Sequence, residues 1–326
     1  MYTKPYSAVH LWIYNHPFNR ISDQAEYFLQ IMRQNGYHVT IGKQPRLDAL
    51  NVVIENFSEA TSDILIDFCK SQRKRVAVIM TEHLDFIDNQ IFIHGDPLWS
   101  DNDYMHPATQ IARIKNLVDC IQYIRCFFIL GDLPELRNIT QMFPGISIHS
   151  LPFPMLEEPP PNRFAQTETA KYAAVFSGFI TDYRDELLES LTKEFSVVCP
   201  RKFISRKMRD LLNRSGKIVL NIPQREGWRW LSLMRVIAAL QCGRATVSLG
   251  TADDSRISIC CYQLDISDSD WIGQLKHYVD DWEAAYLRAF ESFSSMAIEY
   301  GQDKKFPHDV FEYWGVTDRT YDRRYR

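Results

Sequence analysis

Residues 217–250 read KIVLNIPQREGWRWLSLMRVIAALQCGRATVSLG, and their pattern decides the fold class. The apolar run Lys217–Ile222 predicts a buried strand. Trp230–Leu240 predicts a helix that ends near Gly243, and Ala245–Leu249 predicts the strand that follows. A strand, a helix and a second strand in this order form the repeating unit of a parallel sheet.

The same alternation of strands and helices extends through the rest of the chain. Strands are predicted in both halves, at 8–14, 37–41, 50–57, 75–80, 126–130, 146–149, 172–177, 195–199 and 262–266. Helices are predicted between them, at 21–35, 59–72, 108–123, 133–142, 182–193, 205–213 and 271–300. The interval from Thr81 to Pro107 shows neither the alternation of apolar residues typical of a strand nor the spacing typical of a helix. The chain is therefore expected to be an α/β protein with two Rossmann-like domains built on parallel sheets.

A proline-rich stretch divides these two halves. Residues 151–169 read LPFPMLEEPPPNRFAQTET and show no periodicity, which is typical of a linker. We therefore expect an N-terminal domain at 1–150, a linker at 151–171, a C-terminal domain at 172–305 and a C-terminal tail at 306–326.

The composition narrows the class of partner and the compartment. The 326 residues are 45% hydrophobic, enough for two ordinary cores, and the net charge of -4 argues against nucleic acid as a partner. The seven cysteines form no CxxC pair, as expected of reduced thiols in the cytoplasm. We expect no signal peptide, because the apolar stretch near the N-terminus is short and interrupted, and no apolar run is long enough to span a membrane; peripheral membrane contact stays open.

Three parts of residues 217–250 resemble the C-terminal donor-binding motif of the group 1 GT-B glycosyltransferases. Glu226-Gly227 matches the loop after the strand, Ser232 and Arg235 lie on the helix that follows, and residues 243–247 match the turn into the next strand. The resemblance implies two Rossmann-like domains that face each other across a cleft. It also implies a glycosyltransferase that moves a sugar from a nucleotide-activated donor to a hydroxyl acceptor on a glycan, a lipid-linked molecule or another compound, without a metal ion or cofactor.

The start of the C-terminal domain, FSGFITDYRDELLESL, also looks like the first strand, turn and helix of such a domain. A Ser177-Gly178 turn before a helix exposes backbone N–H groups at the positive end of the helix dipole, where a diphosphate can bind. Thr181 lies in the same turn, and Arg184 one turn into the helix can add a charge-assisted hydrogen bond to phosphate. We therefore expect Ser177, Gly178, Thr181, Arg184, Glu226, Gly227, Ser232 and Arg235 to bind the donor.

One position departs from the family pattern. In the retaining families that carry two glutamates spaced by seven residues, the second would stand five residues before Gly243, where this chain has Ala238. The donor is then bound differently, for example through Arg235 or Arg244, or Glu226 reaches the sugar from its loop. Two alternatives stay open. One is an epimerase or hydrolase of sugar nucleotides with this fold, and the other, suggested by Ala238, is a binding or scaffold protein without catalytic activity.

An inverting transfer needs a base that removes the proton of the acceptor hydroxyl, and in this architecture the first domain usually supplies it. His16 follows the first predicted strand, and the cluster Glu82, His83 and Asp85 follows the strand 75–80. Glu55, at the end of a buried strand, ranks third. The histidines show no metal-binding spacing, and the glycines form no phosphate-binding loop of the kinase or dehydrogenase type.

Overall fold

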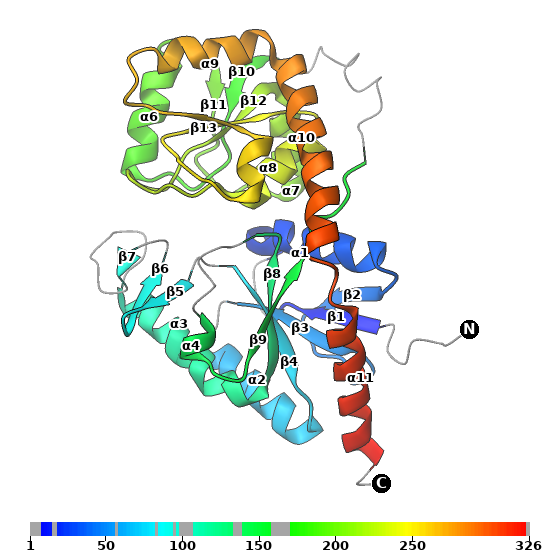
Figure 1. Cartoon of the computed structure of the whole chain (residues 1–326). Coiled ribbons are helices and arrows are strands. Elements are labelled where there is room, and N and C mark those ends of the chain that lie inside the picture. Colours follow the sequence, from blue (N-terminus) through cyan, green and yellow to red (C-terminus); the bar gives the residue numbers. More distant parts are fainter. Residues whose placement is uncertain are drawn as a thin grey trace. The chain divides into compact units, whose positions relative to one another are not determined.

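The computed structural model describes residues 8–14, 18–55, 58–81, 84–93, 96–97, 107–132, 139–157 and 170–323. The chain divides into two compact units. Unit 1 comprises residues 1–154 and 300–326, and unit 2 comprises residues 155–299. Each unit is built on its own parallel sheet (Figure 1).

The parallel sheet of unit 1 has the strand order β2-β1-β3-β4-β8-β9. Its strands are β1 (Ala8–Trp12), β2 (His38–Gly42), β3 (Leu50–Ile54), β4 (Val76–Met80), β8 (Ile124–Leu130) and β9 (Ser147–Leu151). Every neighbouring pair is parallel. All five residues of β3 and of β4 are buried, as expected for central strands covered on both faces.

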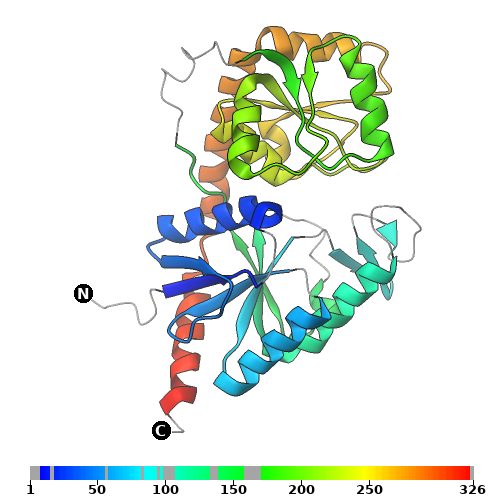
Figure 2. The ribbon, with the colours of Figure 1, turned by 180° about the vertical axis from the view of Figure 1, so that it is seen from behind.

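Helices cover both faces of this sheet (Figures 1 and 2). They are α1 (Phe18–Gln34), α2 (Glu59–Gln72), α3 (Pro107–Cys120) with the 3-10 turn η1 (Ile121–Tyr123), α4 (Ile139–Met142) and α11 (His308–Arg323). Leu65 of α2 and Leu117 of α3 share a core cluster with Val53 and Val78 of the sheet. On α11, the ring of Phe311 stacks on Phe128 of β8 at 5.1 Å.

The interval 81–107, which shows no period in the sequence, contains a small antiparallel sheet. It is formed by β5 (Leu84–Ile87), β6 (Gln90–Ile93) and β7 (Asp96–Pro97). Asp88 and Asn89 join β5 to β6 with φ angles of 49° and 61°, the left-handed pair that a tight two-residue hairpin requires.

The C-terminal residues, expected to be a tail, form α11 and belong to unit 1. Trp314 is fully buried, and Phe306 and Phe311 lie against the ring of Tyr37. The start of the expected linker also packs into this unit, because the Tyr27 hydroxyl donates to the carbonyl of Pro152 at 3.0 Å. The C-terminal residues and the start of the expected linker therefore both pack into unit 1.

Unit 2 contains a parallel sheet with the strand order β11-β10-β12-β13-β14. The strands are β10 (Tyr172–Val175), β11 (Val197–Val198), β12 (Gly216–Asn221), β13 (Thr246–Leu249) and β14 (Tyr262–Leu264). The other elements are α6 (Asp182–Thr192), α7 (Arg206–Ser215), α8 (Leu233–Gln241), the 3-10 helix η4 (Arg256–Cys260), α9 (Trp271–Asp280) and α10 (Trp282–Asp303), which ends in unit 1.

Alternating side chains of the unit 2 strands pack on opposite faces of the sheet. Phe176 and Leu220 pack with Leu188 of α6 and with α9 on one face. Val219 packs with Leu212 of α7 and Ala239 of α8 on the other face. No helix in the described part of the chain is long and apolar enough to cross a membrane.

Candidate functional site

The order of the strands locates a topological switch point in each parallel sheet. In unit 2, β11 and β12 lie on opposite sides of β10, so the connections that leave these strands diverge. Ligands of doubly wound α/β folds bind at such a switch point, outside the carboxyl ends of the strands. The predicted donor residues of unit 2 follow β10 and β12, and therefore flank this switch point.

The loop after β10 contains Ser177 and Gly178, both partly exposed, and ends at Thr181, the N-cap of α6. The Thr181 hydroxyl also donates to the carbonyl of Gln224 at 2.6 Å, which ties this loop to the loop after β12. Thr181 therefore positions both loops of the switch point.

Gly178 is needed for space. A Cβ at this position would lie 2.4 Å from Cζ of Phe176 and 2.9 Å from Nη2 of Arg235. Neither the buried Phe176 ring nor the nearby guanidinium leaves room for a side chain. The loop after β10 can therefore pass close to Arg235 only because residue 178 is glycine.

Arg184 is 5% exposed and donates to backbone carbonyls of both loops. Its Nη1 donates to the carbonyl of Phe179 at 2.7 Å, and its Nη2 donates to that of Ile222 at 2.6 Å. Its Nε donates to the same Ile222 carbonyl at 2.9 Å. In the structure Arg184 thus holds the two loops together.

Arg235 lies at the switch point itself. Its Nη1 donates to Oδ1 of Asn221, the last residue of β12, at 2.7 Å, and its Cζ lies 4.9 Å from the centre of the Phe176 ring after β10. The residue belongs to the first turn of α8, where Ser232 is the N-cap. Ser232 is exposed, and its hydroxyl makes no cap hydrogen bond. A guanidinium therefore stands beside the positive end of a helix dipole, a combination suited to an anion.

A chain of buried hydrogen bonds runs from Asn221 along the carboxyl edge of the sheet. Asn221 donates to Ser248 Oγ at 2.8 Å, and Thr251 donates to the same Oγ at 2.7 Å and to Oε1 of Gln263 at 2.8 Å. Gln263 donates to the carbonyl of Asp253 at 2.7 Å. The network fixes the side-chain amide that orients Arg235.

Asp253, which is 6% exposed, completes this network. Its carboxylate accepts from the backbone N–H of Leu231 and of Ser255, both at 2.7 Å. Leu231 directly precedes the N-cap of α8, so Asp253 holds the entrance of that helix in place. This network was not predicted from the sequence, where its signal is a polar residue at or near the end of each of three consecutive strands, β12, β13 and β14.

Glu226 and Gly227 lie exposed in the loop after β12, and Gly227 has a φ of 76°. Burial, and secondarily the negative charge of Glu226, raise the pKa of Tyr183 on α6 above its usual value. Farther along this loop, Arg229 lies over the Trp230 ring at 4.4 Å. Glu226 is thus a carboxylate on the solvent side of the switch point.

Ala238 and Arg244 are both buried in unit 2. Ala238 is 4% exposed and packs in the interior of unit 2, so a ligand-facing acid is absent from this position. Arg244 precedes β13, at the opposite edge of the sheet, and donates to the carbonyl of Arg214 at 2.8 Å. Burial lowers the pKa of Arg244 to about 10. The expectation that Arg244 binds the donor is therefore wrong, and its role is structural.

In unit 1 the third candidate base, Glu55, has a partner. Arg113 of α3 donates to both carboxylate oxygens at 2.7 Å, and the Thr81 hydroxyl donates to Oε2 at 3.2 Å. Glu55 is buried and Arg113 is only 14% exposed, so solvent screens this ion pair little. Asp85 lies within β5 and accepts from the N–H of Phe86 at 2.8 Å. His16, Glu82 and His83 lie outside the described residues.

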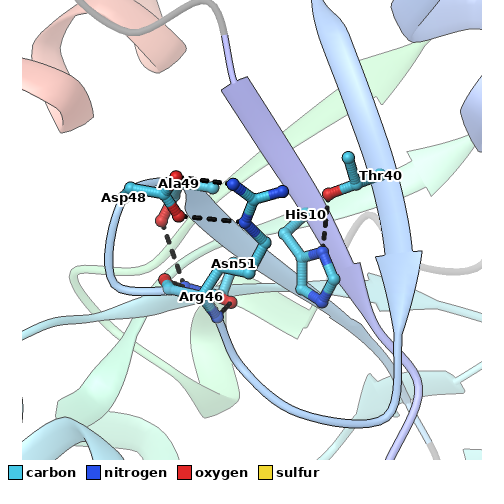
Figure 3. Close-up of polar contacts among 6 residues, drawn as sticks. All are labelled: His10, Thr40, Arg46, Asp48, Ala49 and Asn51. Atoms are coloured by element: carbon cyan, nitrogen blue, oxygen red, sulfur yellow. Dashed lines mark hydrogen bonds and ion pairs between the residues drawn. The ribbon is translucent and has the colours of Figure 1, made fainter.

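The histidine of β1, His10, is also structural (Figure 3). Its Nδ1 bonds the Thr40 hydroxyl at 2.7 Å, and its Nε2 bonds the carbonyl of Gln44 at 2.9 Å. Burial lowers the pKa of His10. Nearby, the Asn51 side chain accepts from the N–H of Arg46 and donates to its carbonyl (Figure 3). These contacts fix the conformation of the loop between β2 and β3.

Among the described residues, no three His, Cys, Asp or Glu side chains are grouped so that they could hold a metal ion. All seven cysteines are free thiols.

The chain matches no family model, and no curated protein sequence matches it. Its fold is similar to that of the phage T4 beta-glucosyltransferase in complex with UDP-glucose, with a TM-score of 0.50 and 11% identity over 93% of this chain and 98% of that chain.

Two other solved structures are less similar. The Anabaena protein HepE in complex with UDP-glucose has a TM-score of 0.48 and 9% identity, over 96% of this chain and 99% of that one. An alpha1,3-fucosyltransferase has a TM-score of 0.43 and 11% identity, over 89% of this chain and 83% of that chain. At identities this low, structural similarity shows a shared fold and does not show a shared function. With one parallel Rossmann-like sheet in each unit and the likeness to the phage T4 enzyme, the chain has the GT-B fold.

Proposed function

We propose that the protein is a glycosyltransferase that moves a sugar from a nucleoside diphosphate sugar to a hydroxyl acceptor. The observation that carries the proposal is the placement of Arg235, a guanidinium at the N-terminus of α8 and at the switch point of the unit 2 sheet. The phage T4 enzyme of the same fold was solved with UDP-glucose, which supports a nucleotide sugar as the donor.

The donor diphosphate would bind to the first-turn N–H groups of α8, the Ser232 hydroxyl and the Arg235 guanidinium. In the transfer, the acceptor oxygen forms a bond to the anomeric carbon while the bond from that carbon to the phosphate oxygen breaks. The electron pair of the broken bond stays on the leaving nucleoside diphosphate. Groups fixed beforehand at this oxygen stabilise the growing negative charge and accelerate the step.

The loops around this site would complete the donor contacts. Ser177 and Gly178 border the site from the β10 side, while Thr181 and Arg184 keep that loop in register with the loop after β12. Because Ala238 is buried, we propose that Glu226, beside Gly227 in its exposed loop, binds a sugar hydroxyl in place of the family's second acid.

The proton of the acceptor hydroxyl must go to a base, and unit 1 is its proposed source. The candidates are His16, which follows β1 in the sequence, and the cluster Glu82, His83 and Asp85, which follows β4 in the sequence. A histidine is suited to this step because its pKa lies near neutrality. The seven free thiols support a reducing, cytoplasmic location.

The test is an assay of products. The full chain is incubated with single nucleotide sugars and a panel of hydroxyl acceptors, and released nucleoside diphosphate and new glycoside are measured by mass spectrometry. We expect equal amounts of both with one donor, and a loss of at least about 100-fold in kcat for the variant that lacks the base, His16→Ala or Asp85→Asn.

The alternatives give other products. Free sugar with nucleotide would indicate a hydrolase, and an altered sugar that stays attached to its nucleotide would indicate an epimerase. Tight binding of a nucleotide sugar without any turnover would indicate a binding protein. Each of these results would overturn the proposed transfer.

A further inference from the structure

The segment around α7 is strongly basic in a protein whose net charge is -4. Residues 201–217 contain seven cations and a single acid, Asp210. The cations are Arg201, Lys202, Arg206, Lys207, Arg209, Arg214 and Lys217. Asp210 is only partly exposed and accepts from Arg209 at 2.9 Å. The exposed surface of this segment therefore carries positive charge.

α7 also turns apolar side chains toward solvent. Met208 is 54% exposed and Leu211 is 49% exposed, while Phe203, just before the helix, is 64% exposed. Leu212 packs on the sheet, and Asn213 is buried. A surface helix normally buries its large apolar residues and exposes its polar ones. Here one apolar residue faces the core, and two lie on the outer face.

The exposed cations and apolar residues of α7 share that outer face. Lys207, Leu211 and Arg214 follow one another at spacings of four and three residues, which places them in one row along the helix. Met208 lies three residues before Leu211 and is the neighbour of Lys207. The loop before the helix adds the exposed Arg201 and Lys202; Arg201 is paired with Asp185.

We propose that this outer face of α7, together with residues 201–203, binds the surface of an anionic lipid bilayer. Such a surface offers negative headgroups to the cations and an apolar layer to Phe203, Met208 and Leu211. Nucleic acid would satisfy the cations but would leave Met208 and Leu211 exposed. The inference goes beyond sugar transfer and does not depend on it, since no residue of the proposed donor site takes part.

The test measures co-sedimentation of the full chain with vesicles at low ionic strength. We expect binding to vesicles that contain phosphatidylglycerol, weaker binding to pure phosphatidylcholine vesicles, and release by salt. The double variant Lys207→Ser, Arg214→Ser should lower the partition coefficient about 25-fold, since each cation near an anionic surface contributes roughly a factor of five. The double variant Met208→Ser, Leu211→Ser should lower it about tenfold.

Matched controls come from α2, an acidic helix with an exposed cation and an exposed apolar residue. Lys70 is exposed and Ile64 is 46% exposed, so Lys70→Ser and Ile64→Ser repeat the chemistry of the test variants elsewhere. We expect both controls to bind vesicles like the wild type. A thermal melt checks that each variant is folded.

Three results would overturn the proposal. The first is an absence of binding to anionic vesicles at low salt, and the second is equal binding to neutral vesicles. The third is a variant Met208→Ser, Leu211→Ser that binds vesicles fully while duplex DNA competes for the same cations, which would indicate a nucleic-acid surface. The assay contains no nucleotide sugar, so failure here and failure of sugar transfer are distinguishable.

Discussion

Replacing Gly178 by alanine tests how closely the loop after β10 approaches Arg235. The new Cβ would lie 2.4 Å from Cζ of Phe176 and 2.9 Å from Nη2 of Arg235, so at least one of these side chains must move. Phe176 is fully buried, and overpacking of this kind costs about 1 to 3 kcal/mol. For a unit of this size the loss corresponds to a fall in Tm of about 2 to 12 °C.

The assay is calorimetric melting, together with titration of a nucleoside diphosphate. Nucleotide affinity should also fall, because the easier movement is that of the partly exposed Arg235. Gly301→Ala is the matched control. Gly301 lies in α10, and a Cβ added there would meet no neighbouring atom within 4 Å, so alanine should preserve or raise stability, by up to about 1 kcal/mol. A Gly178→Ala protein with unchanged Tm and affinity would refute the packing argument.

Three further predictions concern other parts of the molecule. Burial lowers the pKa of His10 below 6.5, so its contribution to stability is complete above pH 6.5 and is lost as the pH falls through the folded-state pKa. Urea denaturation should show a smaller loss of stability on acidification for His10→Gln than for the wild type, and an identical loss would contradict this role. Glu55→Ala should destabilise the protein, by up to about 3 to 5 kcal/mol, because the mostly buried guanidinium of Arg113 would lose this carboxylate. The double variant Glu55→Leu, Arg113→Met should recover much of that stability, and failure to do so would show that the ion pair is not the cause. Nucleotide binding should survive EDTA, because Arg235 and a helix N-terminus hold the diphosphate in our proposal; a loss that Mg²⁺ or Mn²⁺ restores would count against it.

The sequence was sufficient to predict which segments form the strands of the two parallel sheets. Apolar runs such as Val76–Met80 and Lys217–Ile222 are buried on both faces, and such runs stand out by composition alone. The small sheet of β5 to β7 was missed because its strands are short and because β5 and β6 are only partly buried. α11 was missed because the last residues of the sequence are strongly charged. Its buried aromatic face, which includes Phe311 and Trp314, therefore does not stand out by composition.

The roles of single charged residues could not be predicted, because they depend on partners that are distant in the sequence. Arg184 meets the carbonyl of Ile222, and Glu55 meets Arg113 only once the helices have packed. Spacing within one segment contains no information on such contacts. Arg235 was selected from the resemblance to the donor-binding motif, whose pattern is local in the sequence; α8 begins at Leu233, three residues after the predicted start of this helix.

The proposed donor site is tested most directly by a calorimetric titration of the full chain with UDP, GDP, ADP and TDP. We expect that one of them binds and that Arg235→Ala weakens its Kd by about 10 to 150-fold, the effect of losing a charge-assisted hydrogen bond. Arg288→Ala, which removes an exposed arginine from α10, should leave the Kd unchanged. If no nucleotide binds, or if Arg235→Ala binds as tightly as the wild type, the switch point of unit 2 is not a donor site.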